Sequence, residues 1–262
     1  MKLKMYQVDA FTSRLFGGNP AAVCPLDEWI SDELLQNIAM ENNLAETAFY
    51  VKKGSQYEIR WLTPAVEVDL CGHATLAAAY VLFYHENHEG DEVQFFSPRS
   101  GQLPVKKTGN LLTLNFPTDT LSQVSITNEL TAGFNHKPIE VWKGKTDYML
   151  VFANEEQVKT LSPDFGLVNK VKARGIIATA KGTQVDFVSR FFAPQSGINE
   201  DPVTGSAHTT LTPYWAEKLD KQTLTAEQIS PRKGYLQCTL LGDRVEIGGE
   251  GRLYLIGDIF VK

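Results

Sequence analysis

Residues 60–64 read RWLTP, and residues 190–194 repeat that pattern as RFFAP. The same order of features follows each stretch: a strand-like run passes into a proline-containing loop, and a glycine then opens a helix. That glycine is Gly72 in the first copy, within CGHA, and Gly205 in the second, within TGSA. The repeated order predicts an internal duplication, with any functional site between the two halves.

The fold class is predicted from how strands and helices are distributed along the chain. Residues 70–84 are apolar nearly all round, which is typical of a buried helix. Many short strands with one such helix per half predict an α+β fold, in which a curled, mostly antiparallel sheet wraps around a helix, twice over. A polar stretch at 117–129 is the expected linker. The predicted halves are therefore residues 1–118 and 119–262, with the last strand able to return to the first half.

Composition and charge exclude several classes of protein. The 262 residues are 43% hydrophobic and 21% charged, as in an ordinary globular protein. The net charge is -6 and no block of basic residues occurs, so nucleic acid and anionic membranes are poor partners. The N-terminus turns polar too early for a signal peptide, and no run reaches membrane-spanning length. Three widely spaced cysteines, Cys24, Cys71 and Cys238, predict the reducing cytoplasm.

Candidate site residues gather at the two glycine-led helix starts. Residues 198–208 read INEDPVTGSAH, which places the acid Asp201 just before Gly205 and Ser206. Unpaired N–H groups at a helix N-terminus form a ready anion site. An acid beside such a site suits proton transfer next to a carboxylate. This pattern predicts that the second half holds a carboxylate and moves a proton close to it.

The first half offers matching groups. Glu46 opens a strand among apolar neighbours, and desolvation of that kind raises a carboxyl pKa toward the range useful for acid/base work. His73 falls in the first turn of the buried helix. The favoured chemistry is proton shuttling between Glu46 and Asp201, on a small carboxylate gripped by the helix ends at Gly72 and Gly205.

Other interpretations of these residues are open. Glu46 can be a solvated strand residue, Asp201 a simple Asp-Pro turn, and His73 a structural histidine. A hydrolase using Ser206 lacks the G-x-S-x-G elbow, and neither a G-x-G-x-x-G nor a Walker motif is present. Cys71, before the helix, can be an activated thiol. A metal site has no supporting H-x-x-H, H-E-x-x-H or C-x-x-C spacing, and its candidate ligands are His73, His208, Cys71 and Asp201.

Four motifs occur in order along essentially the whole chain: FGGNPAAV at 16–23, AETAF at 45–49, CGHAT at 71–75 and EDPVTGSAH at 200–208. Together they resemble the phenazine-biosynthesis isomerase family (PhzF-like), which belongs to the diaminopimelate epimerase superfamily. The resemblance implies two pseudo-symmetric domains, each with a sheet around a central helix, often as a homodimer and without a cofactor or metal.

The same likeness assigns roles to individual residues. True epimerases need a cysteine in each half, but here only Cys71 is present, which puts two-thiol racemisation in doubt. The expected activity is therefore an isomerase that moves a proton and a double bond on a small carboxylate, such as a cyclic or aromatic amino acid. A racemase or epimerase is one alternative, and a non-catalytic protein that binds a metabolite or partner is another. By the resemblance, the catalytic residues are Glu46, Asp201, His73 and Ser206, while Asn19, Gly72 and Gly205 bind the substrate.

Overall fold

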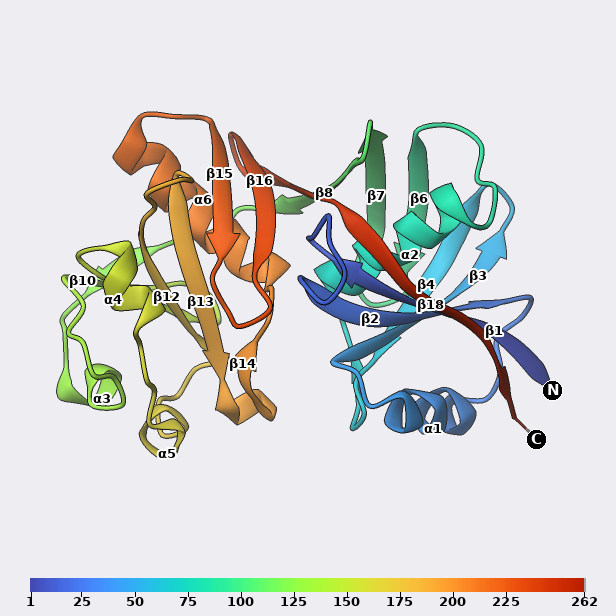
Figure 1. Cartoon of the computed structure of the whole chain (residues 1–262), viewed down its shortest axis with the longest axis horizontal. Coiled ribbons are helices and arrows are strands. Elements are labelled where there is room, and N and C mark those ends of the chain that lie inside the picture. The colour runs from blue at the N-terminus through green and yellow to red at the C-terminus, as the bar shows by residue number, and fades with distance from the viewer. Residues whose placement is uncertain (262) are drawn as a thin grey trace. The chain divides into compact units, whose positions relative to one another are not determined.

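The computed structural model describes residues 1–261, which form two compact units (Figure 1). Unit 1 contains residues 1–115 and the C-terminal residues from 248 onward, and unit 2 contains residues 116–247. The last strand thus belongs to the unit formed by the N-terminal residues. Among the described residues, no helix is both long and apolar enough to cross a membrane.

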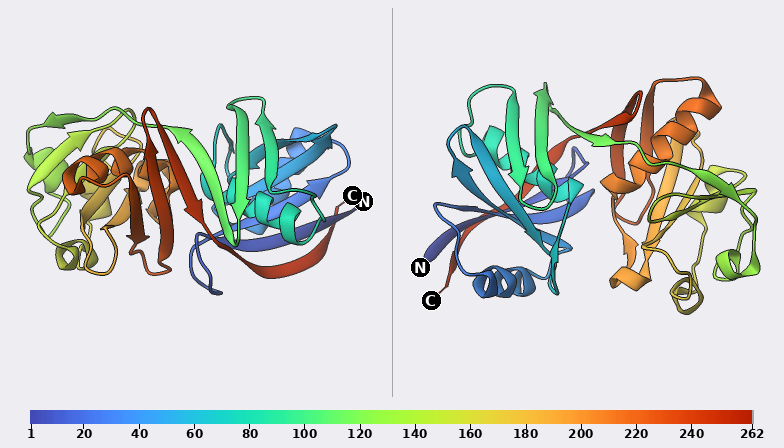
Figure 2. Two further views of the ribbon diagram at one scale, coloured as in Figure 1. Left: turned by 90° about the horizontal axis from the view of Figure 1, so that it is seen from above. Right: turned by 180° about the vertical axis from the view of Figure 1, so that it is seen from behind.

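Unit 1 is a curved sheet around one central helix, α2 (Gly72–Tyr84) (Figure 1). Ten of the thirteen α2 residues are buried, which explains why its sequence is apolar on every side. The first and last strands pair antiparallel, so both chain ends lie side by side in this unit (Figure 2). The other elements are β1 (Lys2–Ala10), β2 (Asn19–Leu26), α1 (Asp32–Asn42), β3 (Glu46–Lys53), β4 (Gln56–Leu62), β5 (Glu67–Val68), β6 (Glu92–Ser97), β7 (Gly101–Thr108), β8 (Leu111–Pro117) and β18 (Gly251–Phe260).

Unit 2 is built in the same manner around α6 (Gly205–Leu219), most of whose residues are buried. A separate apolar core lies between the strands of unit 2 and its short helices, and includes Val158, Ile176 and Phe192. The other elements are β9 (Ser122–Val124), α3 (Asn128–Thr131), β10 (Glu140–Lys143), β11 (Tyr148–Val151), α4 (Glu155–Lys159), α5 (Phe165–Val168), β12 (Ile176–Lys181), β13 (Phe187–Ala193), the 3₁₀ turn η1 (Pro194–Ser196), β14 (Ile198–Asp201), β15 (Thr223–Gln228), β16 (Gly234–Leu241) and β17 (Arg244–Gly249).

Strand pairing shows that the two units share one topology. In unit 1, β1–β2 and β3–β4 are antiparallel, whereas β2–β3 and β4–β6 are parallel. In unit 2, β10–β11 and β12–β13 are antiparallel, whereas β11–β12 and β13–β15 are parallel. Each series ends in an antiparallel pair, β6–β7 or β15–β16, and the central helix is inserted at the same step. The chain is an α+β protein made of two equivalent halves.

The sequence repeat marks equivalent places in these halves. Arg60 in β4 forms two hydrogen bonds with the Glu67 carboxylate, each 2.8 Å long. Arg190 in β13 binds the Glu200 carboxylate in the same two-pronged way, at 2.7 and 2.8 Å. Each glutamate lies on the short strand that follows, β5 or β14. Because each unit contains this arginine–glutamate pair, both copies of the repeat begin with arginine.

Candidate active site

Strand register places Glu46 and Asn19 at the same edge of unit 1. Glu46 is the first residue of β3 and Asn19 is the first residue of β2. These strands are parallel, with Glu46 opposite Ala21, so their starting ends lie together. The turn before β2 is fixed by Gly18, whose φ is +60° and where an added Cβ would lie 2.1 Å from the Ala10 carbonyl oxygen. Only glycine can occupy that position and deliver Asn19 to the buried edge.

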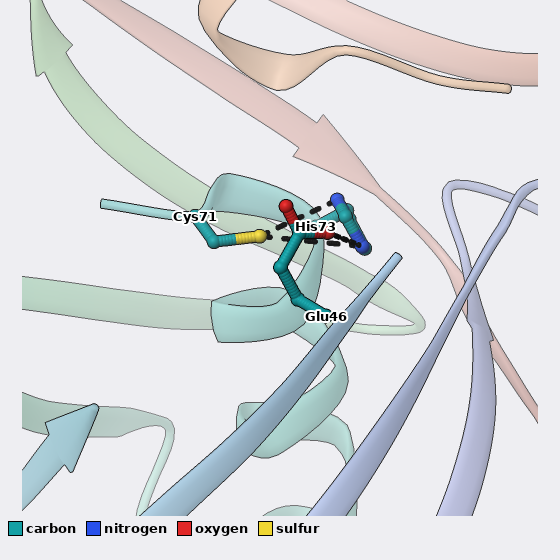
Figure 3. Close-up of side chains that lie close together, drawn as sticks. All are labelled: Glu46, Cys71 and His73. Carbon is teal, nitrogen blue, oxygen red and sulfur yellow. Dashed lines mark hydrogen bonds and ion pairs between the residues drawn. The ribbon is translucent and has the colours of Figure 1, made fainter. Parts of the chain in front are cut away.

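The N-terminus of α2 brings His73 to this edge (Figure 3). The Nε2 atom of His73 lies 3.2 Å from Oε2 of Glu46. Its Nδ1 atom lies 3.3 Å from the amide nitrogen of Asn19. Both His73 and Asn19 are buried, while the Glu46 side chain keeps 14% of its surface exposed. Three of the predicted site residues therefore form one connected group in unit 1.

The hydrogen-bond directions in this group follow from the chemistry of its members. The amide nitrogen of Asn19 can only donate, so Nδ1 of His73 accepts. Burial lowers the pKa of His73 to about 3, so the ring is neutral near pH 7 and carries its one proton on Nε2. The contact between His73 and Glu46 therefore joins a neutral imidazole to a carboxylate, rather than two charged groups. Asn19 holds the ring of His73 beside the Glu46 carboxylate.

Cys71 adds a sulfur atom to the group. Its Sγ lies 3.5 Å from Nδ1 and 4.0 Å from Nε2 of His73, and its side chain is buried (Figure 3). Within residues 1–261, Glu46, Cys71 and His73 form a cluster of potential metal ligands. The metal interpretation disfavoured by the sequence shares Cys71 and His73 with this cluster, whereas its other two candidates, His208 and Asp201, belong to unit 2. His208 lies in unit 2, where its Nδ1 is 2.9 Å from the Thr204 carbonyl oxygen one helical turn back.

The second group of predicted residues lies at the start of α6 in unit 2. Asp201 ends β14, and its Oδ2 accepts a 2.5 Å hydrogen bond from the hydroxyl of Thr204, the residue that caps the helix. Gln228 holds the same loop by donating to the Asp201 carbonyl oxygen at 2.8 Å and accepting from the Thr204 N–H at 2.9 Å. Gly205 is buried and Ser206 is half-buried. The loop therefore holds Asp201 and Ser206 on a common support.

Arg174 is a member of this second group that the sequence analysis missed. It donates 3.0 Å to the Ser206 hydroxyl from one guanidinium nitrogen, and its other two nitrogens bind the buried carboxylate of Asp147. Ser206 is therefore bonded to a guanidinium, which cannot act as a general base. This contact argues against a serine hydrolase that uses Ser206.

The two central helices lack the side-chain caps that three peripheral helices have. Ser31, Asn154 and Asp164 each cap a peripheral helix, accepting a hydrogen bond from a first-turn N–H. Within residues 1–261, the cap residues Cys71 and Thr204 make no such bond to their helices, and neither first turn contains an acid. The positive ends of α2 and α6 are therefore suited to an external anion.

The fold defines a class, that of the epimerase-like α+β proteins with two equivalent halves. The family model described as phenazine biosynthesis-like protein, PhzC-PhzF, matches residues 8–256. The chain belongs to this family.

Individual relatives agree with that assignment over the full length. An uncharacterized isomerase of Pseudomonas aeruginosa is 52% identical over 260 residues, which cover 99% of both chains. The crystal structure of a PhzF family protein from Enterococcus faecalis is 45% identical, covers 100% of both chains and has a TM-score of 0.97. A hydroxyproline epimerase from Agrobacterium vitis has a TM-score of 0.64 at 10% identity, covering 98% of this chain and 92% of its own. That last likeness shows the shared fold alone.

Proposed function

We propose that this protein is a cofactor-independent isomerase that moves a proton, and with it a double bond, on a small carboxylate. The observation that carries the proposal is the chain of contacts from Asn19 through His73 to Glu46. It holds one carboxylate in a fixed orientation at the uncapped end of a buried helix. Families whose members are described as isomerases support the reaction class.

In the proposed reaction, Glu46 acts as the general base and then as the general acid. Its carboxylate takes a proton from a carbon of the substrate, so a C–H bond breaks and an O–H bond forms on Glu46. The electron pair left behind shifts the neighbouring double bond, and Glu46 returns the proton to the carbon at the other end of the shifted system. Neutral His73 stays beside Glu46 throughout, with its Nε2 atom 3.2 Å from the carboxylate oxygen.

We further propose that backbone donors at Gly72 and Gly205 bind the substrate carboxylate and that Asp201 and Ser206 complete the catalytic set. The uncapped first turns of α2 and α6 support the binding role. The hydroxyl of Ser206 can donate to an anion because its oxygen already accepts from Arg174. The family likeness extends the proposal to a cytoplasmic homodimer that acts on a cyclic or aromatic amino-acid-like substrate.

The test is deuterium wash-in followed by NMR. A panel of small cyclic and aromatic amino acids and hydroxy acids is incubated in D2O with wild type, with Glu46→Gln and with Glu41→Gln. Glu41 is an exposed residue of α1 and serves as the matched control. We expect exchange or isomerisation of at least one compound, unchanged in Glu41→Gln and slower by about two to four orders of magnitude in Glu46→Gln.

The other outcomes each correct a different part of the proposal. Exchange that survives in Glu46→Gln would assign the base to another residue. Exchange at one carbon with inversion and no double-bond shift would make the protein a racemase or epimerase. Silence across the panel, from folded protein that still binds a compound, would favour a non-catalytic binding protein.

A further inference from the structure

Three different ligand atoms meet at the start of α2. The carboxylate of Glu46, the thiol of Cys71 and the imidazole of His73 offer an oxygen, a sulfur and a nitrogen, all within 4.8 Å of one another. Figure 3 shows the three side chains turned toward one another. Proton transfer by Glu46 needs no sulfur at this place, so the thiol is a feature that the proposed reaction does not use.

The separations suit a tetrahedral ion of zinc size. Bonds of about 2.0–2.1 Å to oxygen and nitrogen and about 2.3 Å to sulfur place tetrahedral ligand atoms roughly 3.3–3.6 Å apart. Nε2 of His73 lies 3.2 Å from Oε2 of Glu46 and 4.0 Å from Sγ of Cys71. The oxygen of Glu46 and the sulfur of Cys71 lie within 4.8 Å of each other, so shifts of up to about one ångström bring all three atoms into coordination. Such shifts lie within ordinary side-chain motion.

The supports of the three ligands are rigid. Cys71 and His73 are buried and are fixed by the first turn of α2, and Glu46 begins β3. Asn19 contacts the far nitrogen of His73, and for a metal-bound imidazole this outer partner must accept from Nδ1–H rather than donate to Nδ1. When an ion binds Nε2, the proton of the neutral ring lies on Nδ1 instead. The side-chain amide of Asn19 then rotates, so that its oxygen accepts a hydrogen bond from Nδ1–H. The thiol proton leaves to solvent.

The chemistry of the set selects the ion. Thiolate and imidazole favour zinc and similar thiophilic cations, whereas Mg²⁺ and Ca²⁺ favour sites made only of oxygen. Three protein ligands leave a fourth position for water, and Glu46 provides the exposed side from which the ion can enter.

We propose that Glu46, Cys71 and His73 reversibly bind one thiophilic divalent cation, Zn²⁺ or a close analogue. The bound ion inhibits the protein, because it occupies the oxygen of Glu46 and the nitrogen of His73 that proton transfer requires. The inhibition rests on the isomerase function proposed above, whereas the binding does not.

The binding is tested without any substrate. The full chain is stripped with a chelator and titrated with Zn²⁺ against a chromophoric competitor, and separately with Co²⁺, whose thiolate complexes absorb in the near ultraviolet. We expect one equivalent to bind, with a thiolate-to-cobalt band. Cys71→Ala should abolish that band and weaken Zn²⁺ binding by at least about ten-fold, since even loss of an outer partner costs that much.

Cys238→Ala is the matched control, because Cys238 is also a free, buried cysteine but lies in unit 2. It should bind the ion as wild type does. If Cys71→Ala fails to fold, the cobalt band of wild type and its loss in Cys71→Ser decide the question. Absence of stoichiometric binding, absence of a thiolate band in wild type, or equal affinity in wild type and Cys71→Ala would overturn the site.

The inhibition is then tested in the wash-in assay. At a Zn²⁺ concentration that saturates the site in the titration, exchange in wild type should stop, and a chelator should restore it. Binding without loss of exchange would overturn the inhibitory role while leaving the site intact. If no compound exchanges at all, the proposed isomerase function fails, yet the binding result stands by itself.

Discussion

At the scale of single residues, hydrogen-bond direction decides what each side chain can offer a ligand. Arg174 carries only donors, so Ser206 must use a lone pair to accept from it. The hydroxyl proton of Ser206 is thereby directed away from Arg174. The carboxylate of Asp147 holds the guanidinium in a two-pronged bond and neutralises most of its charge. In the function proposed above, Arg174 is therefore a positioning residue, because it would act on the substrate anion through Ser206.

This arrangement predicts that Arg174→Met weakens substrate binding more than turnover. A hydrogen bond to a charged group contributes about 1.5–3 kcal/mol, so KM should rise by about ten-fold or more while kcat falls by less. Arg174→Lys should restore little, because a lysine cannot bridge Asp147 and Ser206. Steady-state kinetics on the substrate found by wash-in provides the measurement. The double variant with Ser206→Ala should lose little beyond Ser206→Ala alone, and additive losses would contradict the coupling.

The contacts of Arg174 could not be predicted from the sequence. It lies in the turn before β12, 27 residues from Asp147 and 32 residues from Ser206, and nothing in its local sequence identifies those partners. Glu46 and His73 could be named because each stands at a visible element start. Their contact, like that of Cys71 with both, depends on how β3 and α2 pack and had to be seen in the structure.

At the scale of elements, the internal duplication places an equivalent arginine–glutamate pair in each unit. Glu200 and Asp201 are adjacent acids in the sequence, but neighbours on a strand point to opposite sides. In β14, Glu200 therefore turns to Arg190, and Asp201 turns to Thr204. The RWLTP and RFFAP repeat predicted equivalent strands correctly, since β4 and β13 occupy the same place in their units. The partner of each arginine was not predictable, since it lies on the next short strand, beyond an intervening loop.

This pair should matter to stability. The side chains of Arg190 and Glu200 are only 11% and 15% exposed, so Glu200→Gln leaves a guanidinium largely desolvated without its counter-charge. We expect a loss of about 2–3 kcal/mol in the free energy of unfolding at pH 7, slightly below the range for fully buried pairs. Urea unfolding of each variant is the measurement.

Glu156→Gln is the control for that comparison. Glu156 and Lys159 form a pair in α4 whose side chains are 71% and 66% exposed, so its loss should cost less than about 0.5 kcal/mol. Glu67→Gln should have a smaller effect in unit 1, because Arg60 keeps its ion pair with Asp32. Equal losses in Glu200→Gln and Glu156→Gln would show that the repeated pair is not a stabilising feature.

At the scale of the whole molecule, each unit keeps one neutral histidine buried at the start of its central helix. Burial lowers the pKa of His73 to about 3 and that of His208 to about 4, from 6.5. Unfolding exposes both rings, so the unfolded chain binds protons at pH values at which the native protein does not. The native state therefore loses stability as the pH falls below about 6.5, and continues to lose it until the native pKa values are reached.

The predicted window lies between pH 7 and pH 5, where the carboxylates do not yet contribute. Glu67, Glu140 and Asp186 also have lowered pKa values, but the stability they supply is present above about pH 4.5 and is lost only below it. Each buried histidine should remove about 2 kcal/mol by pH 5, since one pKa unit corresponds to about 1.4 kcal/mol. The midpoint of urea unfolding, followed at pH 7, 6 and 5, measures the loss.

His208→Gln separates this mechanism from general acid sensitivity. An uncharged amide can still donate to the Thr204 carbonyl oxygen but cannot take up a proton in the unfolded chain. The variant should therefore lose about 2 kcal/mol less stability than wild type between pH 7 and pH 5, while His73 and His85, whose pKa burial also lowers, still contribute. His136→Gln, at a histidine near the surface, should keep the wild-type slope. If the slope in His208→Gln equals that of wild type, the acid sensitivity arises elsewhere and the buried ring of α6 is not its source.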